Sequence, residues 1–305
     1  MKISVIMPCH NGAAWVRNAL QSIAAQTLPP HEIIVVNDAS TDASVEAIES
    51  SGVPLTLLHT SHGNAAAARN AGAHVVGDTD WLAFLDADNH WFPNHLESLS
   101  KAFERNAAAV AGYAWPVSEQ SDASLQQFKE NGSREAAPAL PRHDGLSHDD
   151  FLTLRGLWRY GFPTSGMVVL RERFEAIGGF DERQVRRHDF DMFMRATLGN
   201  LWFASSEASW WMRPPRPGDI SSNKAECHRF ALRAMKNHMR HYPTRLMQEV
   251  VEREARAAIS TLLKHPVETL DEAFWQECLD HVPALRRTFY RLKYQYATAT
   301  RGARA

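Results

Sequence analysis

The sequence has few cysteines, no long apolar run and no excess of basic residues, and each absence narrows the classes of protein to which it can belong. Its three cysteines, Cys9, Cys227 and Cys278, lie far apart and show no C-x-x-C spacing, which argues against a disulfide framework and a zinc ribbon. A reducing compartment is therefore expected. The formal net charge is -2, so no overall positive field attracts nucleic acid, and nucleic acid is not an expected partner.

The apolar run near the start of the chain is short. It ends at Pro8, in MKISVIMP, and is too short for the core of a signal peptide or for a membrane-spanning helix. We therefore interpret it as a β-strand and expect a cytoplasmic protein.

What the sequence does contain is an alternation of β-branched segments with segments of helical periodicity, which is typical of βαβ units around a mainly parallel sheet. The expected strands are KISVIM, EIIVVN, 55–59, WLAFL and 166–170. The expected helices follow Asn11-Gly12 and DASTD and cover 64–75, 93–103, 151–160 and 189–197. The fold class is therefore α/β.

Two segments interrupt or end this pattern. Residues 116–147 are polar with little periodicity, and both a binding loop and an unstructured surface insertion explain them. Residues 223–298 show helical periodicity broken only at prolines. We therefore divide the chain into an α/β domain, 1–222, and a helical C-terminal extension, 223–305. The first contains a nucleotide-binding half, 1–115, and an acceptor half, 116–222.

Two carboxylates end the strand WLAFL. Asp86 and Asp88 are one residue apart, so in an extended chain they project to the same side, at the carboxyl end of the strand, where open α/β sheets bind ligands. Such a pair suits a divalent cation, Mn²⁺ or Mg²⁺, that also holds substrate phosphates. Taken alone, the motif is explained equally well by one aspartate capping a helix and the other being solvated.

Polar residues also follow the first two strands, as His10-Asn11 and as Asn37-Asp38. Because the carboxyl ends of parallel strands meet at one edge of a sheet, three polar ends are expected to converge there. Together they indicate a nucleotide site.

The ordered series VIMPCHNG, IIVVNDASTD, NAAAARNAG, FLDAD, GGFDE and HDFDMFMR resembles glycosyltransferase family 2 over residues 2–222. The series is far more specific than any one motif. The resemblance implies inverting enzymes of the GT-A fold, a Rossmann-like nucleotide-diphospho-sugar transferase with a mixed, mainly parallel sheet flanked by helices. The helical extension lies outside it.

The resemblance assigns nucleotide-sugar contacts to the first half. Pro8 and Asn11 match the loop that opens the nucleotide pocket, with His10 in place of the usual aromatic residue. Asp38 matches the aspartate that accepts the uracil N3 proton, which favours a UDP donor. Asp42 closes the same motif, and helix capping explains it as well.

The same resemblance extends to the alanine-rich helix and the paired carboxylates. Arg69 and Asn70 match an A-R-N-x-G segment; Arg69 is expected to reach donor phosphate or Asp86, with a surface ion pair as the alternative. Asp86 would face the ribose and metal-bound water, and Asp88 would bind the metal directly. Asn89 stands where the family often has another aspartate, so the site has one negative charge fewer.

The catalytic base is expected in the second half. His188-Asp189 aligns with the family's Glu-Asp pair, so Asp189 is the residue expected to take the acceptor proton, with His188 replacing glutamate. Asp191 is the alternative base, and it is also explained as a solvated residue in a first helical turn. Ser165 and Arg213 match weaker acceptor-side and closing-loop motifs.

These assignments predict a metal-dependent inverting glycosyltransferase that moves a sugar from a nucleotide diphosphate donor, with UDP favoured, to an acceptor hydroxyl. The acceptor is a saccharide, a lipid-linked molecule or another hydroxyl compound, in cell-surface polysaccharide or glycoconjugate synthesis. A sugar nucleotidyltransferase is disfavoured because PCHNG is not a G-x-G-T-R-L loop. A non-catalytic nucleotide-sugar binding module is the other alternative, since several common motif residues are replaced.

The last part of the chain is basic. From Pro283 onward there are six basic residues and no acidic ones, interleaved with aromatic residues. Peripheral contact with anionic lipid and a merely solvated helix face both explain this composition. A homodimer formed through apolar residues of the helical extension is a further expectation.

Overall fold

The structure is a computed structural model that describes residues 1–117, 144–157, 162–212, 219, 222–264 and 271–302. The chain forms two compact units, Met1–Pro214 and Pro215–Ala305. Expected features in the remaining residues, including Arg213 and most of the polar segment 116–147, lie outside the described residues.

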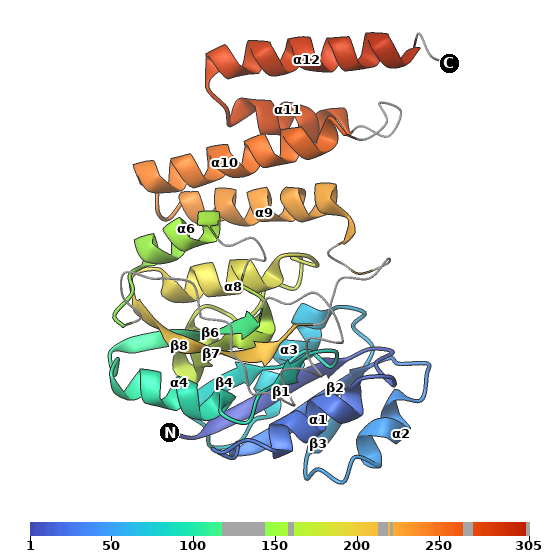
Figure 1. The fold of residues 1–305 in the computed structure, drawn as a ribbon, viewed down its shortest axis with the longest axis vertical. Helices are drawn as coiled ribbons and strands as arrows, with labels where there is room; N and C mark the ends of the chain where they lie inside the picture. The colour runs from blue at the N-terminus through green and yellow to red at the C-terminus, as the bar shows by residue number, and fades with distance from the viewer. Residues whose placement is uncertain (118–143, 158–161, 213–218, 220–221, 265–270, 303–305) are drawn as a thin grey trace. The chain divides into compact units, whose positions relative to one another are not determined.

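The first unit is built on an eight-stranded sheet of order β3-β2-β1-β4-β7-β6-β8-β5 (Figure 1). Four strands are mutually parallel in the order β3-β2-β1-β4. They are β1 (Ile3–Cys9), β2 (Glu32–Asp38), β3 (Thr56–Thr60) and β4 (Trp81–Phe84). These strands confirm the four expected from the first part of the sequence.

The other half of the sheet is mixed. Strand β7 (Met167–Leu170) runs antiparallel to β4 and β6, whereas β6 (Ala109–Val117) and β8 (Leu201–Trp211) pair in parallel. The short β5 (His90–Trp91) pairs antiparallel with β8. Of the strands β5 to β8, only β7 was expected from the sequence. Strand β6 is rich in alanine and glycine, which have low β-propensity. It forms a strand because large side chains of the neighbouring strands pack over these small residues. A Cβ on Gly112 would lie 2.2 Å from the ring of Phe203.

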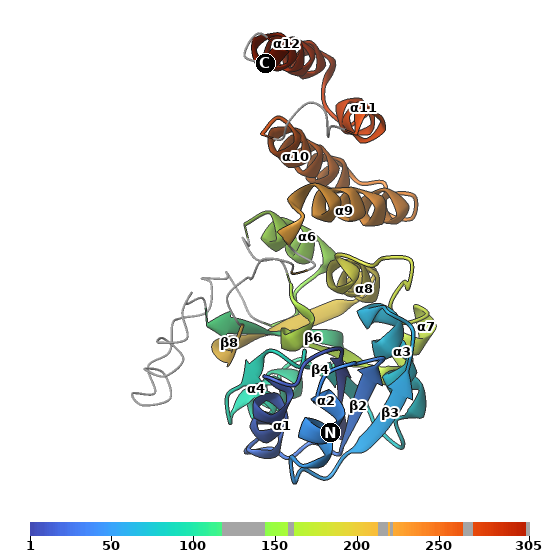
Figure 2. The ribbon, with the colours of Figure 1, turned by 90° about the vertical axis from the view of Figure 1, so that its right-hand side faces the viewer.

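Helices cover both faces of the sheet (Figure 2). Odd-numbered β1 residues share a core with α1 (Val16–Ala24), α2 (Ser44–Glu49) and α4 (His95–Glu104). The opposite face meets α3 (Ala65–Val75), where Gly72 approaches the even-numbered Ile6. This alternation follows from the two-residue period of a strand.

Among the described residues, the first unit also contains α6 (His148–Leu157), the 3₁₀ turn η1 (Thr164–Gly166), α7 (Arg171–Ala176) and α8 (His188–Thr197). Helix α4 begins two residues after Pro93, because residues 93–94 form a turn. Helix α6 begins three residues earlier than expected. The Asp150 carboxylate accepts hydrogen bonds from the backbone and hydroxyl of Ser147, at 2.7 Å each, and the Ser147 hydroxyl accepts from the Asp150 amide. This reciprocal arrangement is a capping box.

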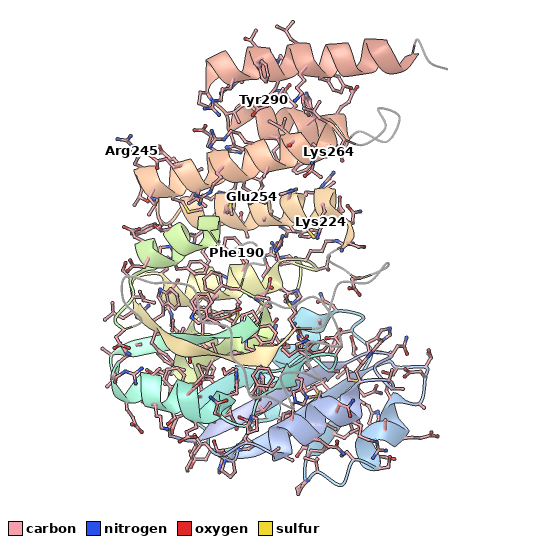
Figure 3. The ribbon with its side chains drawn as sticks, in the orientation of Figure 1. Phe190, Lys224, Arg245, Glu254, Lys264 and Tyr290 are labelled. Atoms are coloured by element: carbon pink, nitrogen blue, oxygen red, sulfur yellow. The ribbon has the colours of Figure 1, made fainter. Side chains whose placement is uncertain are left out.

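The described part of the second unit contains the helices α9 (Lys224–Met239), α10 (Arg245–Leu262), α11 (Glu272–Asp280) and α12 (Ala284–Gly302), in chain order (Figure 1). Side chains at the starts of three of them accept backbone hydrogen bonds, namely Asn223, Thr244 and Asp271. Between α9 and α10, His228 bridges Glu254 and Thr261 at 2.7 and 3.1 Å; Figure 3 labels Glu254. The helical extension is thus confirmed. Among the described residues, every helix is too short or too polar to cross a bilayer.

Candidate functional site

Three polar strand ends lie side by side in the structure. Strand β1 has β2 on one side and β4 on the other, all three parallel, with Cys9 opposite Asn37 and Ile6 opposite Phe84. The segments that follow these strands therefore emerge at one edge of the sheet. This is the edge at which open α/β sheets bind ligands.

The loops after β1 and β2 are joined through Asn11. This residue has φ +50°, a conformation that asparagine tolerates better than most residues. Its backbone N–H donates to Ser40 Oγ at 2.9 Å, and its side-chain oxygen accepts from the Thr41 N–H at 2.8 Å. Asn11 thereby sets the geometry of the loop pair.

Asp42 fastens the same two loops. Its carboxylate accepts from the Ala13 N–H at 3.1 Å and from the Ser44 N–H at 3.0 Å, just before α2 begins. Desolvation alone would raise the pKa of Asp42, but the hydrogen bonds from Ser44 and Ala13 outweigh it and lower the pKa. Asp42 therefore stays ionised and holds the loop in place.

His10 is exposed at this edge of the sheet, in the loop directly after β1. Pro8 lies near the end of β1, opposite Val36 of β2. The His10 Nδ1 donates to the Asp38 carbonyl at 2.6 Å, and its Nε2 accepts from the Asn11 side-chain amide at 3.2 Å. A carbonyl can only accept, so these partners define the neutral Nδ1–H tautomer. The imidazole is held in one orientation and presents a planar surface.

Asp38 is buried at the end of β2. Its carboxylate accepts from Thr60 Oγ1 at 3.0 Å and from the backbone N–H groups of His62 at 2.6 Å and Asn64 at 3.0 Å. Desolvation would raise the pKa of Asp38, but the hydrogen bonds from Asn64, His62 and Thr60 more than compensate, and the pKa is lowered. Asp38 thus organises the loop that leads into α3.

Arg69 connects the two halves of the first unit. Its side chain is 3% exposed; one terminal nitrogen donates to Asp86, and the other lies 2.8 Å from His188 Nε2. The guanidinium also lies 5.5 Å from the centroid of the Phe180 ring, within the range of a cation–π contact. Asp86 and His188, at the turn after β4 and at the start of α8, therefore lie close together, on either side of the Arg69 guanidinium.

His188 is neutral in this arrangement. Burial, followed by the nearby charge of Arg69, lowers the pKa of His188 to about 3. A guanidinium has only donors, so His188 Nε2 must accept the hydrogen bond and the proton lies on Nδ1. A glutamate at this position would neutralise Arg69, whereas His188 supports it without doing so.

The paired carboxylates lie in a turn, not on an extended strand as expected. Strand β4 ends at Phe84, and the Asn89 N–H donates to the Asp86 carbonyl at 3.0 Å, which closes a turn over residues 86–89. The buried Ser165 Oγ accepts from the Asp86 N–H at 3.1 Å and from the Asn89 side-chain amide at 2.8 Å. The turn forms because Ser165 fixes both of its ends, a contact 79 residues distant in sequence.

The turn fits a cation that is held partly by substrate phosphates better than one that is held by protein side chains alone. Asp86 is paired with Arg69, and Asp88 is half-buried. Across the part of the chain that the structure describes, no three histidine, cysteine, aspartate or glutamate side chains are grouped as a set of metal ligands. Mg²⁺ commonly binds through one or two carboxylates plus substrate phosphates. The residues present fit a cation in that manner, with Asp88 and Asp86 on the protein side.

Asp189 and Asp191 differ in their surroundings at the start of α8. Asp191 is buried, and its Oδ2 accepts from both Nε and Nη2 of Arg195, at 2.9 and 2.7 Å. Asp189 is half-buried, and its Oδ1 accepts from the adjacent Phe190 N–H at 2.8 Å. Burial, followed by the charge of Asp189, raises the pKa of Tyr113 well above its usual value. Of the two carboxylates, Asp189 is therefore the one that accepts fewer hydrogen bonds from the described residues.

Two arginines that were not expected from the sequence precede this helix. Arg186 Nη1 and Arg187 Nε are buried and make no hydrogen bond to any described residue, and the same is true of Arg69 Nε. Arg187 also has φ +56°, which is strained for a long side chain. Unpaired buried donors are costly unless a ligand satisfies them, so each of these guanidinium groups can donate to an anionic ligand that reaches it. The adjacent arginines before HDFD were the available signal.

Asn70 joins the halves through backbone contacts. Its amide donates to the Phe180 carbonyl at 3.0 Å, and its oxygen accepts from the Phe180 N–H at 2.9 Å. A Cβ on Gly179 would lie 2.6 Å from that oxygen. The structure thus places Asn70 against the GGFDE segment, which it holds beside α3.

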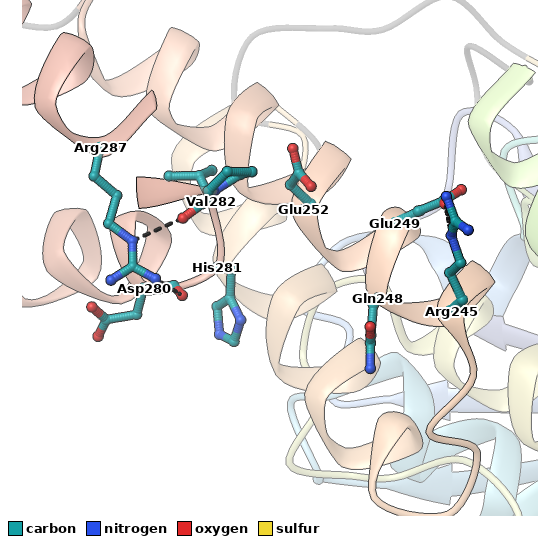
Figure 4. Close-up of a pocket in the computed structure, with 9 residues that line it drawn as sticks. Arg245, Gln248, Glu249, Glu252, Asp280, His281, Val282 and Arg287 are labelled. Carbon is teal, nitrogen blue, oxygen red and sulfur yellow. Dashed lines mark hydrogen bonds and ion pairs between the residues drawn. The ribbon is translucent and has the colours of Figure 1, made fainter. Parts of the chain in front are cut away.

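A separate hollow of about 380 Å³ lies in the helical unit, between α10 and the α11–α12 junction (Figure 4). Several of its charged residues already have partners: Arg245 pairs with Glu249 at 3.0 Å, Glu252 pairs with Arg256 at 3.4 Å, and Arg287 donates to the Val282 and Asp280 backbone carbonyls at 2.8 and 3.1 Å. Such contacts stabilise the helix ends and leave little charge for a ligand.

The family model for glycosyl transferase family 2 matches residues 4–163, which is more than half of the chain and includes the strand ends described above. The chain belongs to this family, and its sheet and helices form a GT-A-like fold.

Named relatives agree with this membership. An uncharacterized glycosyltransferase of Nostoc sp., alr2836, is 29% identical over 189 residues, which cover 59% of this chain and 54% of that protein. The amylovoran biosynthesis glycosyltransferase AmsB of Erwinia amylovora is 26% identical over 208 residues, which cover 64% of each protein. The chain thus matches between about half and two thirds of the length of these relatives.

Solved structures share the fold. Residues 1–349 of TarS from S. aureus, in complex with UDP-GlcNAc, match with a TM-score of 0.71 at 19% identity, covering 100% of this chain and 92% of that chain. The mannosyltransferase PcManGT of Pyrobaculum calidifontis, in complex with GDP-Man and Mn²⁺, matches with a TM-score of 0.58 at 17% identity, covering 98% and 86%.

Proposed function

We propose that this chain is an inverting glycosyltransferase that transfers a sugar from a nucleoside diphosphate donor to an acceptor hydroxyl. The observation that carries the proposal is the position of Arg69, which contacts Asp86 on the nucleotide side and His188 beside Asp189 on the acceptor side. A donor phosphate and an acceptor hydroxyl bound at these two sides would be close to each other. Holding two reactants in this way accounts for much of the rate of such reactions.

The donor base and phosphates have separate candidate contacts. His10 offers an oriented ring for stacking, and Asp38 is an ionised carboxylate at the same edge. Arg69, Arg186 and Arg187 supply guanidinium donors for phosphate oxygens. A divalent cation held by Asp88 and Asp86 together with the diphosphate would stabilise the leaving charge. The UDP-GlcNAc complex of TarS supports UDP as the nucleotide, and the Mn²⁺ complex of PcManGT supports a metal.

Asp189 is the proposed general base. It takes the proton from the acceptor hydroxyl, whose oxygen then attacks the anomeric carbon from the face opposite the leaving diphosphate. The bond to the diphosphate breaks as the new glycosidic bond forms, so the configuration inverts. Asp191 is less suited to this role because its carboxylate is bound by Arg195.

The acceptor is proposed to be a saccharide or lipid-linked hydroxyl compound of cell-surface polysaccharide synthesis. The name of AmsB, an amylovoran biosynthesis glycosyltransferase, supports a role in biosynthesis. Ser165 acts indirectly in this proposal, because it fixes the turn of Asp86 and Asp88 from the acceptor side.

The proposal is tested by a thermal-shift screen of UDP-, GDP- and dTDP-sugars with and without Mn²⁺, followed by an assay of donor hydrolysis. A matched donor should raise Tm by mass action, more so with metal, and should be hydrolysed slowly. Asp88→Asn should lose the metal-dependent part of both effects. Asp78→Asn, a change at an exposed aspartate paired with Lys2, is the control and should keep them.

This screen and one further assay separate the alternatives. A donor that raises Tm but is never hydrolysed or transferred would indicate a non-catalytic binding module. Release of pyrophosphate from a nucleoside triphosphate and a sugar phosphate would indicate a nucleotidyltransferase. If no nucleotide sugar changed Tm, the proposed function would be wrong.

A further inference from the structure

The last helix of the chain has an apolar outer face. Phe289 and Leu292 of α12 are 60% and 61% exposed. They are three residues apart and therefore lie on the same side of the helix. Two large apolar side chains exposed together on one helix indicate a surface that is covered by something else.

Basic residues lie beside this apolar face. Arg286 and Lys293 are exposed and seven residues apart, so they share one flank of it. The exposed Arg291 lies beyond Leu292, nearer to the side of the helix that carries Tyr294. We call Arg286, Phe289, Arg291, Leu292 and Lys293 together the outer face of α12. An apolar centre with basic flanks is the arrangement of helices that lie in a membrane interface.

The opposite side of α12 is already occupied. The Tyr294 ring packs on Trp275 of α11 with centroids 5.1 Å apart. Arg287 donates to the Val282 and Asp280 carbonyls at the end of α11, so this basic residue is part of the helical packing. In Figures 1 and 2, α12 is the last of the four stacked helices, and α11 lies between it and α10; Tyr290 is labelled on α12 in Figure 3. Contact with α11 therefore leaves the outer face without a helix partner among the described helices of this unit.

We propose that the outer face of α12 docks on an anionic lipid surface. Phe289 and Leu292 enter the region between headgroups and acyl chains, and the three cations contact lipid phosphates. A second copy of the chain fits less well, since pairing two such faces brings like charges together, and there is no acidic residue from Pro283 to the end of the chain. The helix lies in the interface and does not cross the bilayer, in line with its polarity. This inference goes beyond sugar transfer and can hold or fail independently of it.

The test is flotation of the full chain with two kinds of vesicle, pure phosphatidylcholine and phosphatidylcholine mixed with phosphatidylglycerol. The protein should float with the anionic vesicles and stay in solution with the neutral ones. Arg286→Gln with Lys293→Gln should weaken the partitioning by about fivefold for each charge removed. Phe289→Ser with Leu292→Ser should abolish flotation, with an unchanged circular dichroism spectrum because both side chains are exposed.

The matched control removes the same number of charges elsewhere in the unit. Arg240→Gln with Arg253→Gln changes two exposed arginines outside α12 and should leave flotation with anionic vesicles nearly unchanged. Equal loss in this control would mean that net charge alone matters, and the proposal would be wrong. It would also be overturned if the wild type failed to float, or if light scattering showed a dimer that Phe289→Ser with Leu292→Ser converts to a monomer.

Discussion

The guanidinium of Arg69 lies 2.8 Å from His188 Nε2 and simultaneously donates to Asp86. Arg69 is therefore held between one anionic and one neutral partner, and it keeps more positive charge than an arginine between two carboxylates would. This charge lies beside the turn that carries Asp88. The identity of residue 188 is thus expected to set both the position and the effective charge of Arg69.

Substitution of His188 tests this relationship. His188→Gln retains a side-chain oxygen that can accept from Arg69, so donor affinity and transfer should stay within a few-fold of the wild type. His188→Leu removes the acceptor and leaves a buried guanidinium donor unpaired, which should lower stability by roughly 1–3 kcal/mol and reduce transfer by more than tenfold. Chemical denaturation and sugar-transfer assays measure both effects. Equal activity of the two variants would show that the contact has no role.

Acid should destabilise the protein through buried histidines. Burial lowers the pKa of His95, which is fully buried against Ser209 Oγ at 2.9 Å, to about 3. In the unfolded chain the pKa returns to about 6.5, so the unfolded state binds the proton first. The stabilisation is present above pH 6.5 and is lost as the pH falls toward 3; His95 alone should reduce the free energy of unfolding by roughly 2 kcal/mol between about pH 7 and pH 5.

Denaturant unfolding as a function of pH measures this loss. His95→Gln should make stability less dependent on pH in this window, even if it lowers stability overall. His74→Gln changes an exposed histidine on α3 and should leave the pH dependence unchanged. A steep pH dependence that persists in His95→Gln would assign the effect to other groups.

The two carboxylates at the start of α8 should differ in what they do. Asp189→Asn removes the proposed base and should lower the transfer rate by about 100-fold or more, with donor affinity nearly unchanged. Asp191→Asn weakens the pair with Arg195 and should lower stability by roughly 1–3 kcal/mol, with a smaller effect on rate. Single-turnover transfer, donor titration and thermal unfolding distinguish the two. If Asp191→Asn were the inactive variant, the roles would be reversed.

Gly72→Ala should disturb the site indirectly, by displacing α3 from the sheet. A Cβ at residue 72 would lie 2.6 Å from Ile6 Cγ2 and 3.1 Å from Val36 Cγ2, so α3 must move away from the sheet, at a cost of about 1–3 kcal/mol. Since α3 carries Arg69, donor affinity should fall together with Tm. Gly77→Ala is the control, because its nearest atom would be 3.7 Å away, and it should change neither.

The sequence was sufficient for the parts of the fold that depend on local pattern. Short β-branched and apolar runs predicted β1 to β4, and helical periodicity broken only at prolines predicted that the second unit is helical. Strand β6 was missed because its alanines and Gly112 carry no local strand signal, and it depends on Phe203 of a distant strand. The turn of Asp86 and Asp88 was taken for an extended chain because Ser165, which fixes it, is 79 residues away. Contacts of this kind depend on the tertiary structure and have no trace in local periodicity.

The contacts that complete the site join residues that are far apart in the chain, 119 residues for Arg69 and His188 and 110 for Asn70 and Phe180. Closing such long loops lowers the chain entropy before the new contacts contribute favourable free energy, so non-local contacts tend to form slowly. During synthesis on the ribosome, a nascent chain that has not yet released residue 188 holds the strand ends of the first half without the residues that join them to α8. The ability to bind a donor with full affinity should therefore appear late in synthesis, after α8 has emerged and folded onto α3.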